Sequence, residues 1–218
     1  MRPLSTLIAI AVLFGSSEAA GTARSSGTPA VFSDEVEFLA AAGAVVKENF
    51  EDNFTTADCD SGALSVIPLN HFTATSDIPA LKLLAQDCFG NHNTTADGLK
   101  YLGADTDVSG VSAAVAFDFV QPLNAFGLFL VDLDFAILNV TVNGVAYPVP
   151  ENGDGGVSYF GIVSPDPFTN VTFQIVTAFD AHYSFDDLAY GPPVGPVGVG
   201  EGNWRAWGSI KADYRRPR

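Results

Sequence analysis

Two stretches of this chain, residues 115–119 and 171–175, alternate between apolar side chains and small or polar ones. A period of two is typical of a β-strand with one buried and one solvent-facing side. The pattern belongs to a larger set of short segments rich in Val, Phe and Thr, bounded by Gly, Pro, Asn and Asp: 45–50, 65–72, 111–119, 125–132, 138–142, 157–160, 171–176 and 183–190. Strands without alternating helices predict an all-β fold, namely a two-sheet antiparallel β-sandwich of the jelly-roll type.

One short helix is predicted before these strands, from Ser33 to Gly43. Ser33 is placed to cap it, acidic residues follow in the first turn, and Gly43 is placed to end it. Between Val142 and Val145, the dipeptide Asn143-Gly144 predicts a two-residue hairpin turn.

The two ends of the chain differ from this body. Residues 1–20 have a basic start, an apolar run and a small-x-small motif, which predict a secretory signal peptide. Residues 21–32 are expected to be a linker, 33–191 the sandwich domain, 192–203 a Pro/Gly linker, and 204–218 a C-terminal tail. We therefore expect a secreted protein, extracellular or at the cell surface, with no transmembrane span.

Charge divides along the same boundaries. The chain has a formal net charge of −15, and residues 25–200 hold three lysines against 22 acids. A phosphate backbone needs a basic surface, so nucleic acid is not an expected partner. The segment 201–218 is basic, with five cations and two acids. In the tail, an apolar stripe of helical spacing runs beside the cations; its residues are Trp204, Trp207, Ile210 and Tyr214.

Cys59 and Cys88 are the two cysteines of the chain. In an exported protein, a disulfide between them is the expected state.

Acidic residues near both ends of the body suggest a metal site. Glu51 and Asp52 follow the first predicted strand, and Asp186 and Asp187 lie in the last one. The first and last strands of a jelly roll are expected to be neighbours, and crowded carboxylates repel unless a cation lies among them. Ca²⁺ accepts six to eight oxygen ligands, so a structural calcium ion is predicted here. The alternative is that these acids simply face water.

A weaker calcium candidate is the run that contains Asp105 and Asp107. It matches the first half of a calcium-binding loop, but Ala116 stands where the twelfth-position acid would be. A polar turn is the alternative.

Four tyrosines lie near predicted turns: Tyr101, Tyr147, Tyr159 and Tyr183. Aromatic rings pack against the apolar faces of sugars, so these four are candidate ligand-binding residues. The alternative is that they are partly buried aromatics at sheet edges.

Several motifs in order resemble a known group. Residues 38–43 with 48–51, then 122–127, then 159–164, 167–173 and 185–188, are similar to segments of secreted bacterial β-sandwich proteins of the PEP-CTERM (exosortase-associated) surface group. The resemblance covers about 33–191 and implies a jelly roll like that of carbohydrate-binding modules. In comparable modules an early Glu and a late Asp hold calcium, which implies Glu51 and Asp186 here.

The C-terminal end departs from that group. It lacks the Pro-Glu-Pro signal and the apolar helix, so anchoring by that group's route is not expected. The tail is instead a candidate tag for export or attachment machinery, and the alternative is a tail whose tryptophans pack on the body. The function expected from the sequence is a non-catalytic, calcium-stabilised module that binds an extracellular glycan or a cell-surface component. The alternatives are a purely structural or adhesive surface component and a secreted glycoside hydrolase with paired carboxylates, for which we predict no catalytic residues.

Overall fold

The computed structural model describes residues 27–51, 57, 59, 62–85, 87–88, 94, 99–105, 114–133, 137–176 and 182–191. It confirms an all-β fold with one short helix, α1 (Glu35–Ala42). The strands are β1 (Ala30–Phe32), β2 (Val46–Glu48), β3 (Val66–Pro68), β4 (Phe72–Ser76), β5 (Leu81–Leu84), β6 (Tyr101–Asp105), β7 (Ala114–Val131), β8 (Leu138–Val142), β9 (Val145–Val149), β10 (Val157–Ile175) and β11 (His182–Gly191).

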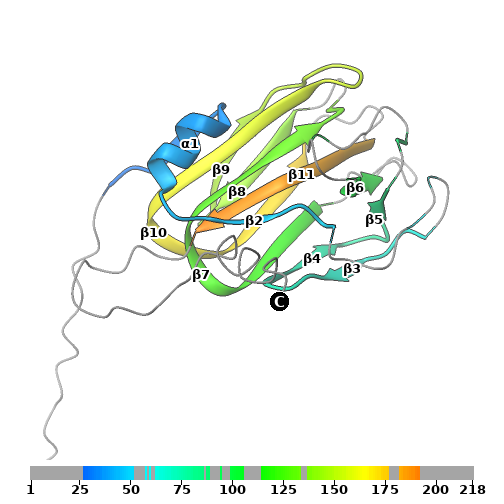
Figure 1. The fold of residues 1–218 in the computed structure, drawn as a ribbon, viewed down its shortest axis with the longest axis horizontal. Helices are drawn as coiled ribbons and strands as arrows, with labels where there is room; N and C mark the ends of the chain where they lie inside the picture. The colour runs from blue at the N-terminus through cyan, green and yellow to red at the C-terminus, as the bar shows by residue number, and fades with distance from the viewer. Residues whose placement is uncertain are drawn as a thin grey trace, which may run out of the picture.

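Two long strands organise the sandwich. β7 and β10 have 18 and 19 residues, and they pair with each other antiparallel along most of their length. Both strands bend near the middle, as Figure 1 shows, and the register between them shifts around Phe168. Each strand therefore contributes one half to each of two layers, because a bulged strand can turn a corner and continue in a second sheet.

The first sheet has the order β3–β4–β7–β10–β8–β9, built on the first half of β7 and the second half of β10. The second sheet has the order β5–β6–β11–β7–β10–β1, built on the other halves. β2 pairs with the end of β11, beside β6 on the same edge. All these pairings are antiparallel. β2 and β11, which correspond to the first and last predicted strands, are neighbours as expected.

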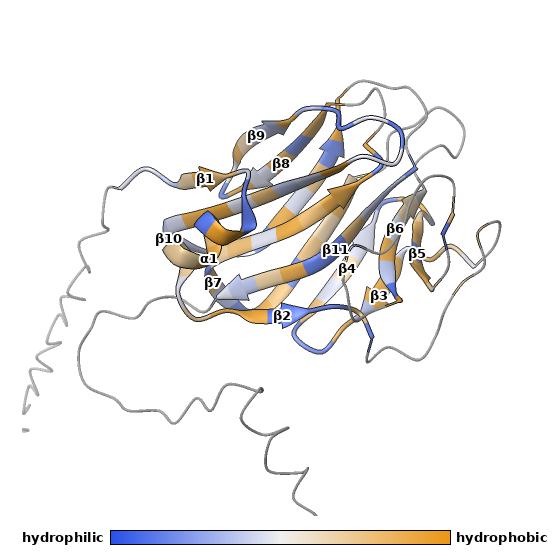
Figure 2. Ribbon diagram, turned by 45° about the horizontal axis from the view of Figure 1, so that its top comes forward, coloured by the Kyte–Doolittle hydropathy of each residue, from blue (hydrophilic) through white to orange (hydrophobic). Residues whose placement is uncertain are grey.

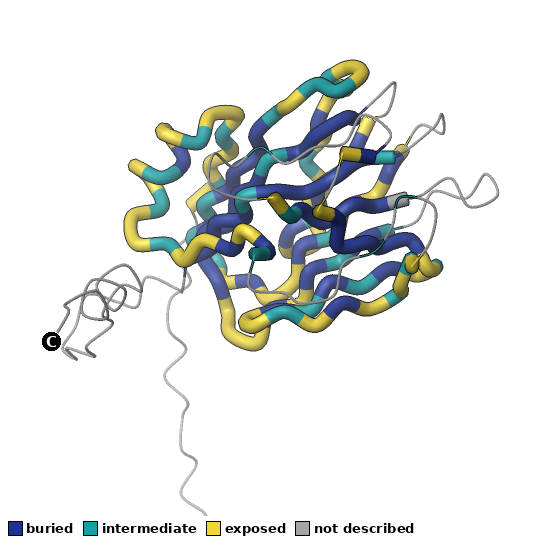
Figure 3. The backbone as a smooth tube through the Cα atoms, turned by 45° about the vertical axis from the view of Figure 1, so that its right-hand side comes forward, coloured by how far each residue is buried: buried dark blue, intermediate teal, exposed yellow. Residues whose placement is uncertain are grey.

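An aromatic core fills the space between the sheets. Phe117 lies at its centre, with ring centroids 5.1 to 5.3 Å from those of Phe72, Phe173 and Phe185. Figure 2 shows the alternation of apolar and polar residues along the strands, and Figure 3 shows buried backbone running through both sheets while α1 and the turns are mostly exposed. Burial of these rings supplies the main stabilisation of the fold.

α1 begins one residue later than predicted. Asp34, not Ser33, is the N-cap: its backbone is extended and its Oδ1 accepts a hydrogen bond from the Glu37 amide at 2.9 Å. Gly43 ends the helix with φ 74°, and its N–H donates to the Leu39 carbonyl, as expected of a C-cap glycine.

Several predicted boundaries are corrected. Residues 30–32 of the expected linker form β1, because their backbone pairs with the free edge of β10. The expected strand 65–72 is a hairpin of β3 and β4, since the chain turns between Leu69 and Phe72. β5 and β6 were not predicted as strands. The Asn143-Gly144 turn is confirmed, with φ of 50° and 77° and Val142 paired to Val145.

The signal peptide, the 192–203 linker and the tail residues Trp204, Trp207, Ile210 and Tyr214 lie outside the described residues. Within the described part, no helix has the length and hydrophobicity that a bilayer span requires.

Candidate functional site

The outward faces of the two sheets differ in what lies over them. The outer face of the second sheet, which we call the covered face, lies beneath α1 at one end and beneath Cys59, Cys88 and Thr94 at the other. The outer face of the first sheet, which we call the open face, carries only exposed and half-buried side chains on its strands. A binding site for a large ligand is therefore expected on the open face.

α1 seals its end of the covered face through one aromatic side chain. Phe38 is fully buried and lies against Tyr159, with ring centroids 5.8 Å apart. Gly127 and Gly161 make room for these rings: a Cβ on Gly127 would lie 3.0 Å from Phe38 Cε1, and one on Gly161 would lie 2.7 Å from Phe38 Cδ2. Close approach is the reason that glycine occupies both positions.

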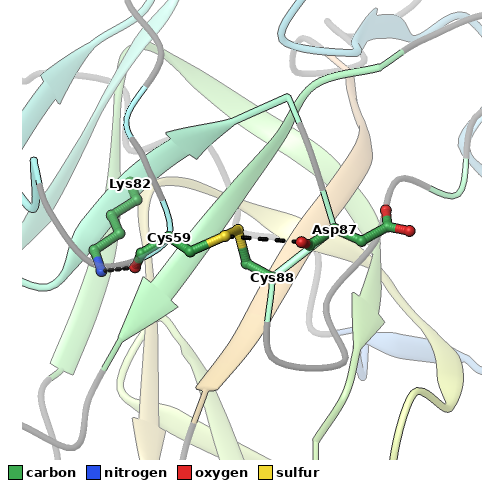
Figure 4. The surroundings of a disulfide bond; sticks show 4 residues. All are labelled: Cys59, Lys82, Asp87 and Cys88. Atoms are coloured by element: carbon green, nitrogen blue, oxygen red, sulfur yellow. Dashed lines mark hydrogen bonds between the residues drawn. A yellow bond between two sulfur atoms is a disulfide. The ribbon is translucent and has the colours of Figure 1, made fainter.

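The disulfide closes the other end. Cys59 and Cys88 are bonded, as predicted, with Cα atoms 5.5 Å apart (Figure 4). Lys82, buried on β5, donates from Nζ to the Cys59 carbonyl at 2.6 Å, and the Cys59 Sγ lies 3.7 Å from the Asp87 carbonyl oxygen. Leu84, Cys88 and Tyr101 form a small apolar cluster there.

Two predicted metal ligands hold the covering residues in place. Asp186 is fully buried on β11, and its Oδ2 accepts hydrogen bonds from the amide and the hydroxyl of Thr94 at 2.6 and 2.8 Å. Glu51, just after β2, accepts from the amides of Leu99 and Lys100 at 2.5 and 2.6 Å. Both carboxylates thus accept from backbone amides, those of Thr94, Leu99 and Lys100.

Asp187 lies at a bulge in β11, where the register to β7 shifts, and has φ 48°. Burial raises the pKa of its carboxyl above the ordinary value; Asp186 and Glu35 add to this, and Lys47 opposes it. Lys47 also forms an ion pair with Glu35 on α1, with Nζ 2.7 Å from Oε1. Burial likewise raises the pKa of the Tyr159 phenol, with Glu35 and Asp187 contributing.

Of the predicted metal ligands, Glu51, Asp186 and Asp187 lie within the described residues. β2 and β11 are neighbours, so the segments with Glu51 and Asp186 lie on the same side of the sandwich. Among the described residues, no three His, Cys, Asp or Glu side chains form a group able to hold a metal ion. Asp52, Asp107 and the side chain of Asp105 lie outside the described residues. Calcium stays a prediction.

The predicted tyrosine platform is wrong. Tyr101 and Tyr183 are 0% exposed and Tyr159 is 7% exposed, so none of them presents a ring to solvent. Tyr101 and Tyr159 do point out of the second sheet, but the disulfide cysteines pack against Tyr101 and Phe38 of α1 packs against Tyr159. Tyr183 packs inside the sandwich, and Tyr147 is half-buried against the core near Phe160.

The open face is polar and nearly uncharged. Its outward residues are threonines, amides and small side chains at alternating positions of β4, β7, β10 and β8: Thr73, Thr75, Ala116, Asp118, Asn139, Thr141, Asn170, Thr172 and Gln174. Direct partners across the strands align them in rows, for example Thr75, Ala116, Thr172 and Thr141. Neighbouring strands are about 4.8 Å apart, so polar groups recur across the sheet at roughly that spacing.

Hydrogen bonds join four of these residues into a network that we call the Asp118 row. Its members are Thr75, Asp118, Asn170 and Thr172. Asn170 Nδ2 donates to Asp118 Oδ1 at 2.7 Å, and Thr75 Oγ1 lies 3.4 Å from Asp118 Oδ2 and from the Ala116 carbonyl. Thr172 Oγ1 donates to Asn170 Oδ1 at 2.9 Å. These contacts fix the side-chain positions before any ligand binds.

Prolines protect both edges of the same sheet. Pro68 on β3 and Pro148 on β9 occupy positions whose backbone nitrogen points away from the neighbouring strand. A proline there cannot donate to a further strand, which discourages edge-to-edge association. The face of the first sheet, and not its edges, is therefore available for a partner.

Cations of the described chain lie away from the open face. Lys47 pairs with Glu35, Lys82 contacts the Cys59 carbonyl, and Lys100 Nζ donates to the Glu51 carbonyl at 3.0 Å. All three contacts are on the side of the second sheet. Asp118 is the charged residue on the rows of the open face.

The open face was missed as a site although its signal was present. The alternation in 115–119 and 171–175 predicted a wetted side, and Asn139-Val140-Thr141 and Asn170-Val171-Thr172 repeat the same polar pattern on adjacent strands. The sequence prediction placed the ligand site at the turns instead, because it was based on the tyrosines found there.

Solved structures with a similar arrangement include two family 11 carbohydrate-binding modules. One is the module of the cellulosomal cellulase Lic26A-Cel5E of Clostridium thermocellum, with TM-score 0.40 and 9% identity over 69% of this chain and 96% of that one. The other, from the same organism and in complex with a β-1,3-1,4-mixed-linked tetrasaccharide, has TM-score 0.38 and 11% identity over 63% and 94%. A GH87 α-1,3-glucanase catalytic domain in complex with nigerose has TM-score 0.35 and 14% identity over 59% of this chain and 28% of that one.

No family model and no curated protein matches the chain. With TM-scores of this size, the ligand of this chain has to be inferred from its own residues.

Proposed function

We propose that this chain is an exported, non-catalytic β-sandwich module that binds a glycan through the open face. The observation that supports the proposal is the Asp118 row on a sheet face whose described outward side chains are exposed or half-buried. Hydroxyl, amide and carboxylate groups, held in place by one another, can exchange hydrogen bonds with the hydroxyl groups of a sugar chain. The chain would act at a cell surface or in an extracellular matrix, where the disulfide is stable.

Affinity electrophoresis of the full chain tests this proposal. Native gels containing hydroxyethylcellulose, mixed-linkage β-glucan or dextran should retard the parent protein in at least one case. The double variant Thr141→Val/Thr172→Val removes two hydroxyls from the open face and keeps side-chain shape and strand propensity. It should lose the retardation at an unchanged melting temperature.

Thr28→Val is the matched control, because Thr28 is exposed but precedes β1 at the far edge of the other sheet. It should behave as the parent does. If no polysaccharide of the panel retards the parent, the chain is better described as a structural or adhesive surface component. Equal retardation of the double variant would place binding elsewhere.

The non-catalytic part of the proposal has its own test. Prolonged incubation of the parent with each polymer that binds should release no reducing ends. Release of reducing ends that stops in one carboxylate-to-amide variant would instead establish a hydrolase with paired acids.

We extend the proposal to a calcium ion near Glu51 and Asp186. Glu51 follows β2 and Asp186 lies on β11, the strand that pairs with β2, and carboxylate oxygens are the ligands that Ca²⁺ prefers. A nearby cation would favour the ionised form of the buried Asp186 carboxyl and of its neighbour Asp187.

We also propose that the C-terminal tail, residues 204–218, mediates attachment at the surface.

A further inference from the structure

We infer that the open face selects glycans without negative charge and that Asp118 is the residue responsible. This inference rests on the proposed function and names the ligand class of the same site. It follows from the direction of the hydrogen bonds in the Asp118 row and from the position of the charged groups around it.

The donors of the row are mostly spent within it. The Thr172 hydroxyl and one N–H of Asn170 donate to neighbouring oxygens at 2.9 and 2.7 Å, and the Thr75 hydroxyl lies 3.4 Å from two oxygens. The remaining capacity of these four side chains is two hydroxyl oxygens, carboxylate lone pairs and part of the amide oxygen, with one N–H left on Asn170. The Asp118 row therefore presents mainly hydrogen-bond acceptors. Its ligand is expected to present hydrogen-bond donors, such as sugar hydroxyls, acetamido N–H groups or ammonium groups.

Charge works in the same direction. Asp118 is exposed on β7, Asp77 directly follows β4, and Asp166 lies where the register of β10 to β7 shifts. The three lysines of the described residues are engaged on the other side of the sandwich. A uronate or sulfate group placed on this face would meet none of the lysines that the structure describes and would face a carboxylate, in a chain of net charge −15.

The experiment compares two soluble polymers on the full chain: the neutral polysaccharide that binds in the panel above and sodium polygalacturonate. The parent should bind the neutral polymer and leave polygalacturonate unbound at 20 mM NaCl. Asp118→Asn keeps the size of the side chain, removes the charge and replaces one acceptor by a donor. It should weaken binding of the neutral polymer about tenfold and reduce the discrimination between the two polymers.

Glu37→Gln is the matched control, since Glu37 is exposed on α1, away from the open face, and loses the same charge. It should leave both affinities unchanged. Raising NaCl to 0.5 M should narrow the discrimination of the parent, because repulsion between exposed charges is screened.

Three results would overturn the inference while the proposed function stands: equal binding of both polymers by the parent, unchanged discrimination in Asp118→Asn, or the same loss in Glu37→Gln. Binding of neither polymer by the parent would instead count against the proposed function itself.

Discussion

At the scale of single residues, Gly127 and Tyr159 form a tight contact that predicts a specific mutant pair. A methyl group on Gly127 would meet the Tyr159 hydroxyl and lie 3.0 Å from Phe38 Cε1. Gly127→Ala should therefore lower stability by about 1–3 kcal/mol through overpacking. The Tyr159 hydroxyl is buried without a hydrogen-bond partner, so Tyr159→Phe should be neutral or slightly stabilising. Urea denaturation of the single and double variants measures both effects, and Tyr159→Phe should recover part of the loss. Equal stability of Gly127→Ala and the parent would contradict this packing.

Asp187 predicts a pH dependence. Burial raises the pKa of its carboxyl above the ordinary 3.8, so the folded state binds the proton more tightly than the unfolded chain does. Its ionised form therefore opposes folding at neutral pH, and that opposition fades as the pH falls through the raised pKa. Asp187→Asn also suits φ 48°, where Asn is well tolerated. In chelator-containing buffer at pH 7, the variant should have a higher melting temperature than the parent, and its free energy of unfolding should be larger by less than about 1 kcal/mol. At pH 3, the two proteins should have the same melting temperature. A lower melting temperature at pH 7 would argue against this reading.

The tyrosines mark what a sequence can and cannot predict about single residues. Period-two alternation predicts which side chains share a face, and it placed Phe117 and Phe173 correctly in the core. It carries no information on what lies over the opposite face. Tyr101 and Tyr159 point out of their sheet and are buried only because distant segments pack over them.

At the scale of elements, the disulfide ties the segment after β5 to the one after β2, and the covering residues above Asp186 depend on both. Replacing Cys59 and Cys88 by Ser should lower the free energy of unfolding by about 3–4 kcal/mol, since the bond joins residues 29 apart. In this variant, hydrogen exchange should become faster at the Thr94 amide, which donates a hydrogen bond to Asp186. The amides of β8 in the other sheet should keep the protection that they have in the parent protein. Two free thiols in the exported protein, or unchanged Thr94 exchange in the variant, would refute this role.

Element prediction succeeded where turn chemistry was explicit and failed where strands bent. Asn143-Gly144 and Gly43 impose backbone conformations that other residues adopt with difficulty, so the hairpin and the helix end were predictable. β7 and β10 were each predicted as two strands, because the bend around Phe168 and its partner Leu123 interrupts the alternation like a turn. Their continuity depends on pairing between segments far apart in the chain.

At the scale of the whole molecule, the sandwich separates its charges and its tasks. The side of one sheet holds the three lysines that the structure describes, the disulfide, α1 and the buried Asp186, and its outer face is covered. The other sheet carries an open row of neutral polar groups around Asp118, with prolines on both outer strands. The closed side stabilises the fold through long-range contacts, which leaves the open side free to bind without holding the fold together.

The pairing of β2 with β11 brings the two ends of the body together, and a calcium ion near Glu51 and Asp186 would stabilise that junction. A ligand that binds only the folded state raises its stability, by about 2.7 kcal/mol at a hundredfold excess over the dissociation constant. The full chain should therefore melt higher in calcium than in EGTA. Glu51→Gln and Asp186→Asn should reduce that difference, whether or not the loss of contacts with Thr94, Leu99 and Lys100 lowers both melting temperatures. Glu37→Gln should retain the whole difference, because its carboxylate lies on the exposed side of α1. The same rise in melting temperature with calcium in all four proteins would place the ion elsewhere. If calcium does not raise the melting temperature of the parent, no calcium ion stabilises this junction.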